Sequence, residues 1–117
     1  LKDVLGHVAD WEWFGVEGLR QMAAGQPPQV EHVQDIDAWN QTHAEARRDQ
    51  PWEAVWADLY AARQALLEVF AEMSQGQLGR FFPVPWGQEG TPYQWIWVYL
   101  RHDREHAKGL RSEEMEQ

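Results

Sequence analysis

The sequence predicts an all-α fold, a bundle of helices, on three observations. Apolar residues recur at helical spacing in three long segments of the 117-residue chain. Caps and breakers separate these segments: QPP at 26–28, DQP at 49–51 and TPYQ at 91–94. No segment shows the alternation of a strand, and GRFFPVPWG at 79–87 holds too much proline for a sheet interior. The length is that of one domain, which we expect to cover residues 1–117.

The first helix is expected over residues 1–24, ended by Gly25. Its broad apolar arc includes His7, and Glu12 lies among apolar neighbours on the same side. A buried carboxylate needs a partner or a raised pKa, so Glu12 is a candidate functional group. Trp13 falls on the opposite, outer face, where it could serve a dimer surface or pack under a loop.

Two helices follow the loop at 26–36. A short, mostly polar helix is expected over 37–48, capped by Asp35 or Asp37. A longer helix is expected over 52–73, where apolar residues repeat at helical spacing with Arg63 as an interruption. Residues 74–79 could form one further turn before the loop RFFPVPWGQEG.

The last helix begins with a capping box, in which Thr91 is the N-cap and Gln94 the third helical residue. We expect it to run to about Arg111, with a frayed tail at 112–117. Its inner arc carries Trp95, Tyr99, His102 and His106, and its outer face carries Trp97.

His102 and His106 are the strongest chemical signal. Residues four apart on a helix have Cβ atoms ~5–6 Å apart, so two imidazoles can reach one ion at ~2.0–2.1 Å. If the first and last helices are antiparallel neighbours, His7 joins them, and three protein ligands plus water form a catalytic type of metal site. The alternative is that these are buried histidines that bond to a carbonyl or carboxylate. His32 and His43, in a loop and on a polar helix, are not expected to be ligands.

Carboxylates and aromatic residues near this site complete the predicted centre. We expect Glu12 or Asp103 to act as a catalytic base or to orient a ligand, and Asp10 is a further candidate for orienting His7. Four aromatic residues would flank the ion: Trp11, Phe14, Trp95 and Tyr99. For Trp11 and Phe14, core packing is the simpler explanation. Trp86 could close the pocket as part of a lid, or simply anchor its loop.

Charge and cysteine content narrow the partners. The net charge of −9 would repel nucleic acid and an anionic membrane surface, and no apolar run approaches the ~20 residues of a membrane span. The chain has no cysteine, which fits a cytoplasmic protein and leaves His, Asp and Glu as the available metal ligands. A small molecule is the expected partner.

The stretches LKDVLGHVADWEW and RHDREHAKGLR together resemble the DinB/YfiT-like superfamily of metal-binding four-helix bundles. HVADWE, AWN at 38–40 and SQGQLGRF look closest to its ClbS/DfsB-like branch. The resemblance implies an up-down-down-up four-helix bundle with His7, His102 and His106 as ligands of a divalent metal, most often nickel or zinc.

The resemblance also implies a function and an oligomeric state. Relatives include metal-dependent hydrolases and transferases that use a low-molecular-weight thiol, and homodimers are common. We therefore expect a metal-dependent enzyme; the alternative is a non-catalytic small-molecule-binding or stress and self-resistance protein. The family's first helix should precede LKDVLGHVADW, and an upstream segment or a partner chain would fill the groove that it leaves.

Overall fold

A computed structural model describes residues 1–28, 33, 35–84 and 89–116, with 110–116 as helical backbone alone. The helices are α1 (Lys2–Ala23), α2 (Ile36–Ala46), α3 (Trp52–Glu72), α4 (Gln75–Leu78) and α5 (Pro92–Glu116). All five were predicted, and α5 continues five residues past its expected end. Within the described ranges there is no strand, only an isolated bridge between Phe82 and Gly90.

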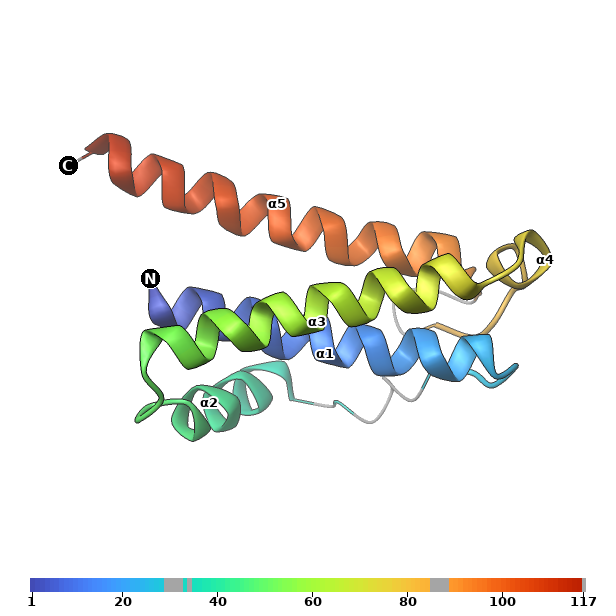
Figure 1. Ribbon diagram of the computed structural model, residues 1–117, viewed down its shortest axis with the longest axis horizontal. Coiled ribbons are helices and arrows are strands. Elements are labelled where there is room, and N and C mark those ends of the chain that lie inside the picture. Colours follow the sequence, from blue (N-terminus) through green and yellow to red (C-terminus); the bar gives the residue numbers. More distant parts are fainter. Residues whose placement is uncertain (29–32, 34, 85–88, 117) are drawn as a thin grey trace.

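The helix order is that of the predicted bundle. α1 packs against α3 along one side and against α5 along another. Figure 1 shows α1 and α3 running in the same direction, with α5 returning antiparallel to both. This down-down-up order matches the last three helices of the up-down-down-up bundle. The short helix α2 lies beside α1, in the connection between α1 and α3.

Side-chain caps start three of the helices, and two of these caps were predicted from the sequence. The Asp35 carboxylate accepts a hydrogen bond from the Ala38 amide at the start of α2. At α5 the Gln94 amide donates to the Thr91 hydroxyl, and the Gln94 side chain accepts from the Thr91 amide. An equivalent box between Ser74 and Gln77 begins α4. These bonds satisfy amides that have no partner inside the helix.

The core depends on a close approach between α1 and α5. Trp95 is fully buried, and its indole nitrogen donates to the Gly15 carbonyl over 2.9 Å. A Cβ at Gly18 would lie 2.4 Å from the Trp95 ring, and one at Gly15 would lie 2.8 Å from the Tyr99 ring. Two glycines three residues apart therefore form the seat for two aromatic rings, because any side chain there would overlap them. The remaining buried residues of this core surround the seat: Val16, Leu19, Met22, Leu66, Met73, Phe82 and Val84.

The prediction for Trp13 is wrong. Its ring is half-buried against α3, where the indole nitrogen donates to Asp58 over 2.8 Å. Asp58 also pairs with Arg47, which in turn binds Asp10 at 2.8 Å. A single apolar arc was too simple for α1, because three other helices contact it. Trp97 lies on an exposed face as predicted, at 49% exposure, whereas Trp86 is outside the described residues.

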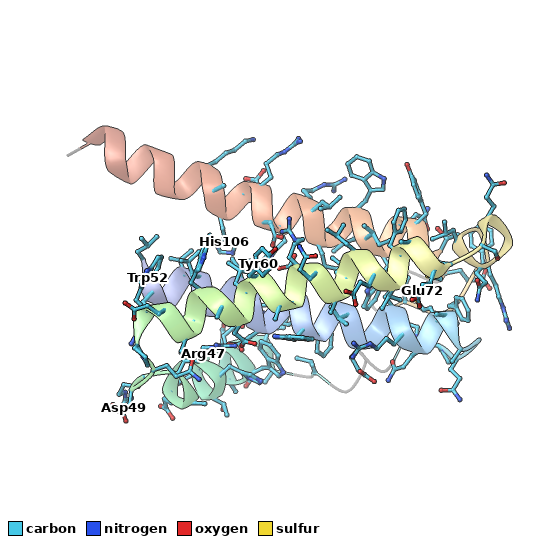
Figure 2. The ribbon with its side chains drawn as sticks, viewed as in Figure 1. Arg47, Asp49, Trp52, Tyr60, Glu72 and His106 are labelled. Atoms are coloured by element: carbon cyan, nitrogen blue, oxygen red, sulfur yellow. The ribbon has the colours of Figure 1, made fainter. Side chains whose placement is uncertain are left out.

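α3 carries a strip of exposed aromatic residues. Trp52, Trp56 and Tyr60 stand one helical turn apart, and Tyr60 is 61% exposed. In Figure 2, Tyr60 points from α3 into the space below α5, on the same side as His106. No helix in the described ranges is long and apolar enough to cross a lipid bilayer.

Candidate metal centre

Three histidines meet where the start of α1 faces α5, as the sequence predicts. His7 comes from α1, and His102 and His106 come from successive turns of α5. The ring centroids are 5.3 Å apart for His7 and His102, 4.9 Å for His7 and His106, and 4.5 Å for His102 and His106. All three side chains are half-buried, so the rings are held by packing yet remain reachable.

The spacing of the ring nitrogens fits a metal ion. One nitrogen from each ring lies within 4.8 Å of the others, and this is the only such group of three metal-ligating side chains among the described residues. The Nε2 atoms of His102 and His106 are 3.1 Å apart. Two nitrogens bound at ~2.0–2.1 Å to a tetrahedral ion stand roughly 3.3 Å from each other, so the pair needs almost no adjustment. Without an ion, the same pair can share a hydrogen bond if one Nε2 carries the proton.

The surroundings of His7 and His106 favour the neutral imidazole, which is the form that binds metals. Burial lowers the pKa of His7, and repulsion from charged His106 and His102 lowers it further, while Asp10 acts in the opposite direction. Burial and then His102 likewise lower the pKa of His106, against the effect of Asp103. A proton therefore competes less with a metal here than at an exposed histidine.

Arg63 of α3 joins the two predicted carboxylates behind the histidines. Its Nε donates to Glu12 Oε1 over 2.6 Å, and its Nη2 forms an ion pair with Asp103. Glu12 is only 1% exposed. Burial, and next the charge of Asp103, raise the pKa of Glu12 to about 7, although Arg63 opposes this. The cluster thus holds a carboxyl group that can gain or lose a proton near neutral pH.

Asp103 also approaches His102 from behind. Its Oδ1 lies 3.8 Å from His102 Nδ1, which is buried and has no hydrogen-bond partner among the described residues. A carboxylate on this ring nitrogen would fix the tautomer that leaves Nε2 free for a metal. Asp10, the other predicted orienting group, is instead bound to Arg47.

An apolar cleft of about 440 Å³ opens beside His7 and His102, between α1, α2 and α5. The four predicted aromatic residues line it: Trp11, Phe14, Trp95 and Tyr99. Trp11 and Phe14, for which core packing was the simpler explanation, are thus part of the cleft wall. Asn40 of α2 contributes a neutral polar group to the wall. Burial raises the pKa of the Tyr99 phenol, which keeps it neutral. Such a volume and lining are typical of small-molecule sites.

The other two histidines stand apart from the three that meet. His43 stacks on Trp39, with ring centroids 3.8 Å apart, and its Nδ1 lies 2.8 Å from the Trp39 carbonyl oxygen. It lines a polar pocket of about 270 Å³ on another side of His7. His32 is outside the described residues.

Two functional features were missed at the sequence level. Arg63 appeared only as an interruption of an apolar pattern, although a charged residue at an inward position signals a buried partner. Asn40 gave no signal, because an amide on a polar helix is ordinary. Its Oδ1 accepts a hydrogen bond from the Trp11 indole over 2.7 Å, which only the structure shows.

Comparison with known proteins agrees with this architecture. No curated protein and no solved structure matches the chain significantly. The family model of the DinB superfamily matches residues 1–108, which include all three clustered histidines. The chain belongs to the DinB superfamily.

Proposed function

We propose that this protein is a metal-dependent enzyme that acts on a small molecule, as a hydrolase or as a thiol-dependent transferase. The observation that carries the proposal is the meeting of His7, His102 and His106, two of which, His7 and His102, line a small-molecule-sized cleft. These residues would hold one divalent ion, nickel or zinc by the family resemblance. When bound, such an ion supplies a water or thiol activated near neutral pH and polarises the substrate.

The two carboxylates are better placed to position than to react. Neither Glu12 nor Asp103 lines the aromatic cleft, and Arg63 holds both. We propose that Asp103 orients the His102 ring and that Glu12 keeps Arg63 in place. Glu12, with its pKa near 7, could also store a proton close to the site.

The absence of Glu12 and Asp103 from the cleft wall favours a second candidate function. A cleft with no carboxylate among its described lining residues suits a non-catalytic protein that sequesters a small molecule, as in stress response or self-resistance. Membership of the ClbS/DfsB-like branch, which the motifs at 7–12 and 38–40 suggest, is part of this proposal. So are a cytoplasmic location and a homodimer, in which the exposed aromatic strip of α3 would be a contact surface.

Metal content tests the centre directly. Purified protein incubated with zinc or nickel should retain about one ion per chain by elemental analysis after gel filtration. His102→Ala should lose that ion, whereas His43→Ala is the matched control and should keep it. An empty wild-type site at neutral pH, or equal loss in both variants, contradicts the metal centre.

Turnover separates the candidates. Conversion of neutral aromatic esters that requires metal alone indicates a hydrolase, and conversion that also requires an added low-molecular-weight thiol indicates a transferase. A small molecule that binds equally well to wild type and His102→Ala, without turnover in either, supports the sequestering protein instead.

A further inference from the structure

The three depressions that border the histidines differ in chemistry. The polar pocket beside His7 is lined by Lys2, Asp3, Asp10 and Arg47. A third depression, of about 280 Å³ between α1, α3 and α5, includes Arg63 and Asp103. The aromatic cleft has no Lys, Arg, Asp or Glu among the described residues that line it. A charged ligand would lose its hydration there without gaining an ionic partner from the wall.

Besides His7 and His102, Asn40 is the polar residue that lines this cleft, and it stands between the cleft and the polar pocket, which it also borders. The indole nitrogen of Trp11 can only donate, so the amide oxygen of Asn40 must be the atom that accepts. This fixes the amide orientation and leaves its NH2 group as a donor. In the described part of the chain, no acceptor bonds to that nitrogen.

Stacked rings hold this arrangement in place. Trp11 packs against Trp39 with centroids 4.2 Å apart, and Trp39 stacks in turn on His43. The donor on Asn40 is therefore attached to a rigid aromatic stack, with His7 and His102 bordering the same cleft. A ligand that covers this donor removes it from water, so a ligand with an acceptor for it is favoured over one that leaves it unmatched.

We propose that the cleft binds an uncharged, mainly aromatic molecule whose carbonyl oxygen accepts a hydrogen bond from the Asn40 amide, and that Asn40 determines this specificity. The proposal deepens the proposed function, on which its relevance to catalysis rests. Binding itself needs only the cleft and Asn40. It can therefore be tested in metal-free full-length chain, so that failure of the metal centre and failure of the cleft are distinguishable.

A matched set of naphthalene probes tests the proposal by calorimetric titration of the metal-free chain. The set comprises 2-acetylnaphthalene, which carries the acceptor, 2-ethylnaphthalene, which lacks it, and the charged 2-naphthoate. Asn40→Asp keeps an acceptor for Trp11 but removes the donor. We expect this variant to weaken the ketone about tenfold and the hydrocarbon less than twofold, with naphthoate at least tenfold weaker than the ketone in wild type.

Two further variants locate the binding. Val98→Trp should fill the cleft and weaken both neutral probes, whereas Tyr60→Ala, in the depression beside α3, should change neither. Equal effects of Asn40→Asp on ketone and hydrocarbon overturn the assignment of Asn40. Tighter binding of naphthoate than of the ketone, or full binding to Val98→Trp, overturns the cleft and its ligand class. Metal retention is measured separately, so none of these results depends on it.

Discussion

Replacing Gly18 by alanine tests the seat on which the aromatic wall of the cleft rests. The new Cβ would stand 2.4 Å from the Trp95 ring, about 1 Å closer than ordinary van der Waals contact begins. Trp95 is fully buried and its indole is bonded to the Gly15 carbonyl, so the ring cannot retreat freely. Overpacking of this kind costs ~1–3 kcal/mol, and weakening the indole bond adds ~0.5–1.5 kcal/mol. Alanine recovers ~1 kcal/mol of helix propensity.

The net expectation is that Gly18→Ala lowers the free energy of unfolding by about 1–3 kcal/mol. Gly109→Ala is the matched control, because Gly109 is also helical but has nothing within 4 Å of its Cβ position. That variant should raise the stability by about 0.5–1 kcal/mol. Urea unfolding followed by circular dichroism should place the two midpoints about 1 M or more apart. A shift of both midpoints in the same direction refutes the seat.

Three further predictions concern the charged groups near the histidines. Between pH 4.5 and 7 folded Glu12 keeps a proton that the unfolded chain releases, so this group's stabilisation is full below pH 4.5 and is lost as pH rises through 7. The free energy of unfolding of metal-free Glu12→Gln, measured by urea titration, should therefore rise by about 2–3 kcal/mol relative to that of metal-free wild type between pH 5 and pH 8. If the two proteins show the same dependence of this free energy on pH, the prediction is wrong. Arg63→Met should destabilise the chain by about 2–3 kcal/mol at pH 8 and by less at pH 5. The value at pH 8 is below that for a fully buried ion pair, because Arg63 is partly exposed. Equal losses of stability at both pH values contradict this prediction. Since the pKa values of His7 and His106 are lowered from 6.5, their protons should compete with zinc only below pH 6.5. Competition with a chromophoric chelator measures the zinc affinity at each pH. A fall in zinc affinity due to these two groups already between pH 8 and pH 7 contradicts the prediction.

The meeting of the three histidines could be predicted because it depends on few quantities. Helical periodicity placed His7, His102 and His106 on inward faces, and an antiparallel packing of the first and last helices brings the start of one to the end of the other. Neither step needs the exact rotation of a helix about its axis. The resemblance to a known bundle supplied the order of the helices.

The network behind the histidines could not be predicted, because it depends on those rotations. Arg63 reaches Glu12 and Asp103 only because α3 turns that side chain toward both α1 and α5. The same limit explains the wrong prediction for Trp13. Trp13 lies on the side of α1 that faces away from α5, but α3 covers that side. Gly18 was visible in the sequence, but its use as a seat depends on a ring 77 positions later in the chain.

α2 has no buried residue, and it nevertheless supplies the cleft wall that contains Asn40. Substitutions along this helix can therefore alter what the protein accepts while barely affecting whether it folds. Ligand preference can therefore change through α2 while the core between α1, α3 and α5 stays the same. Libraries randomised at the cleft-facing positions of α2 should yield many folded variants with divergent ligand preferences.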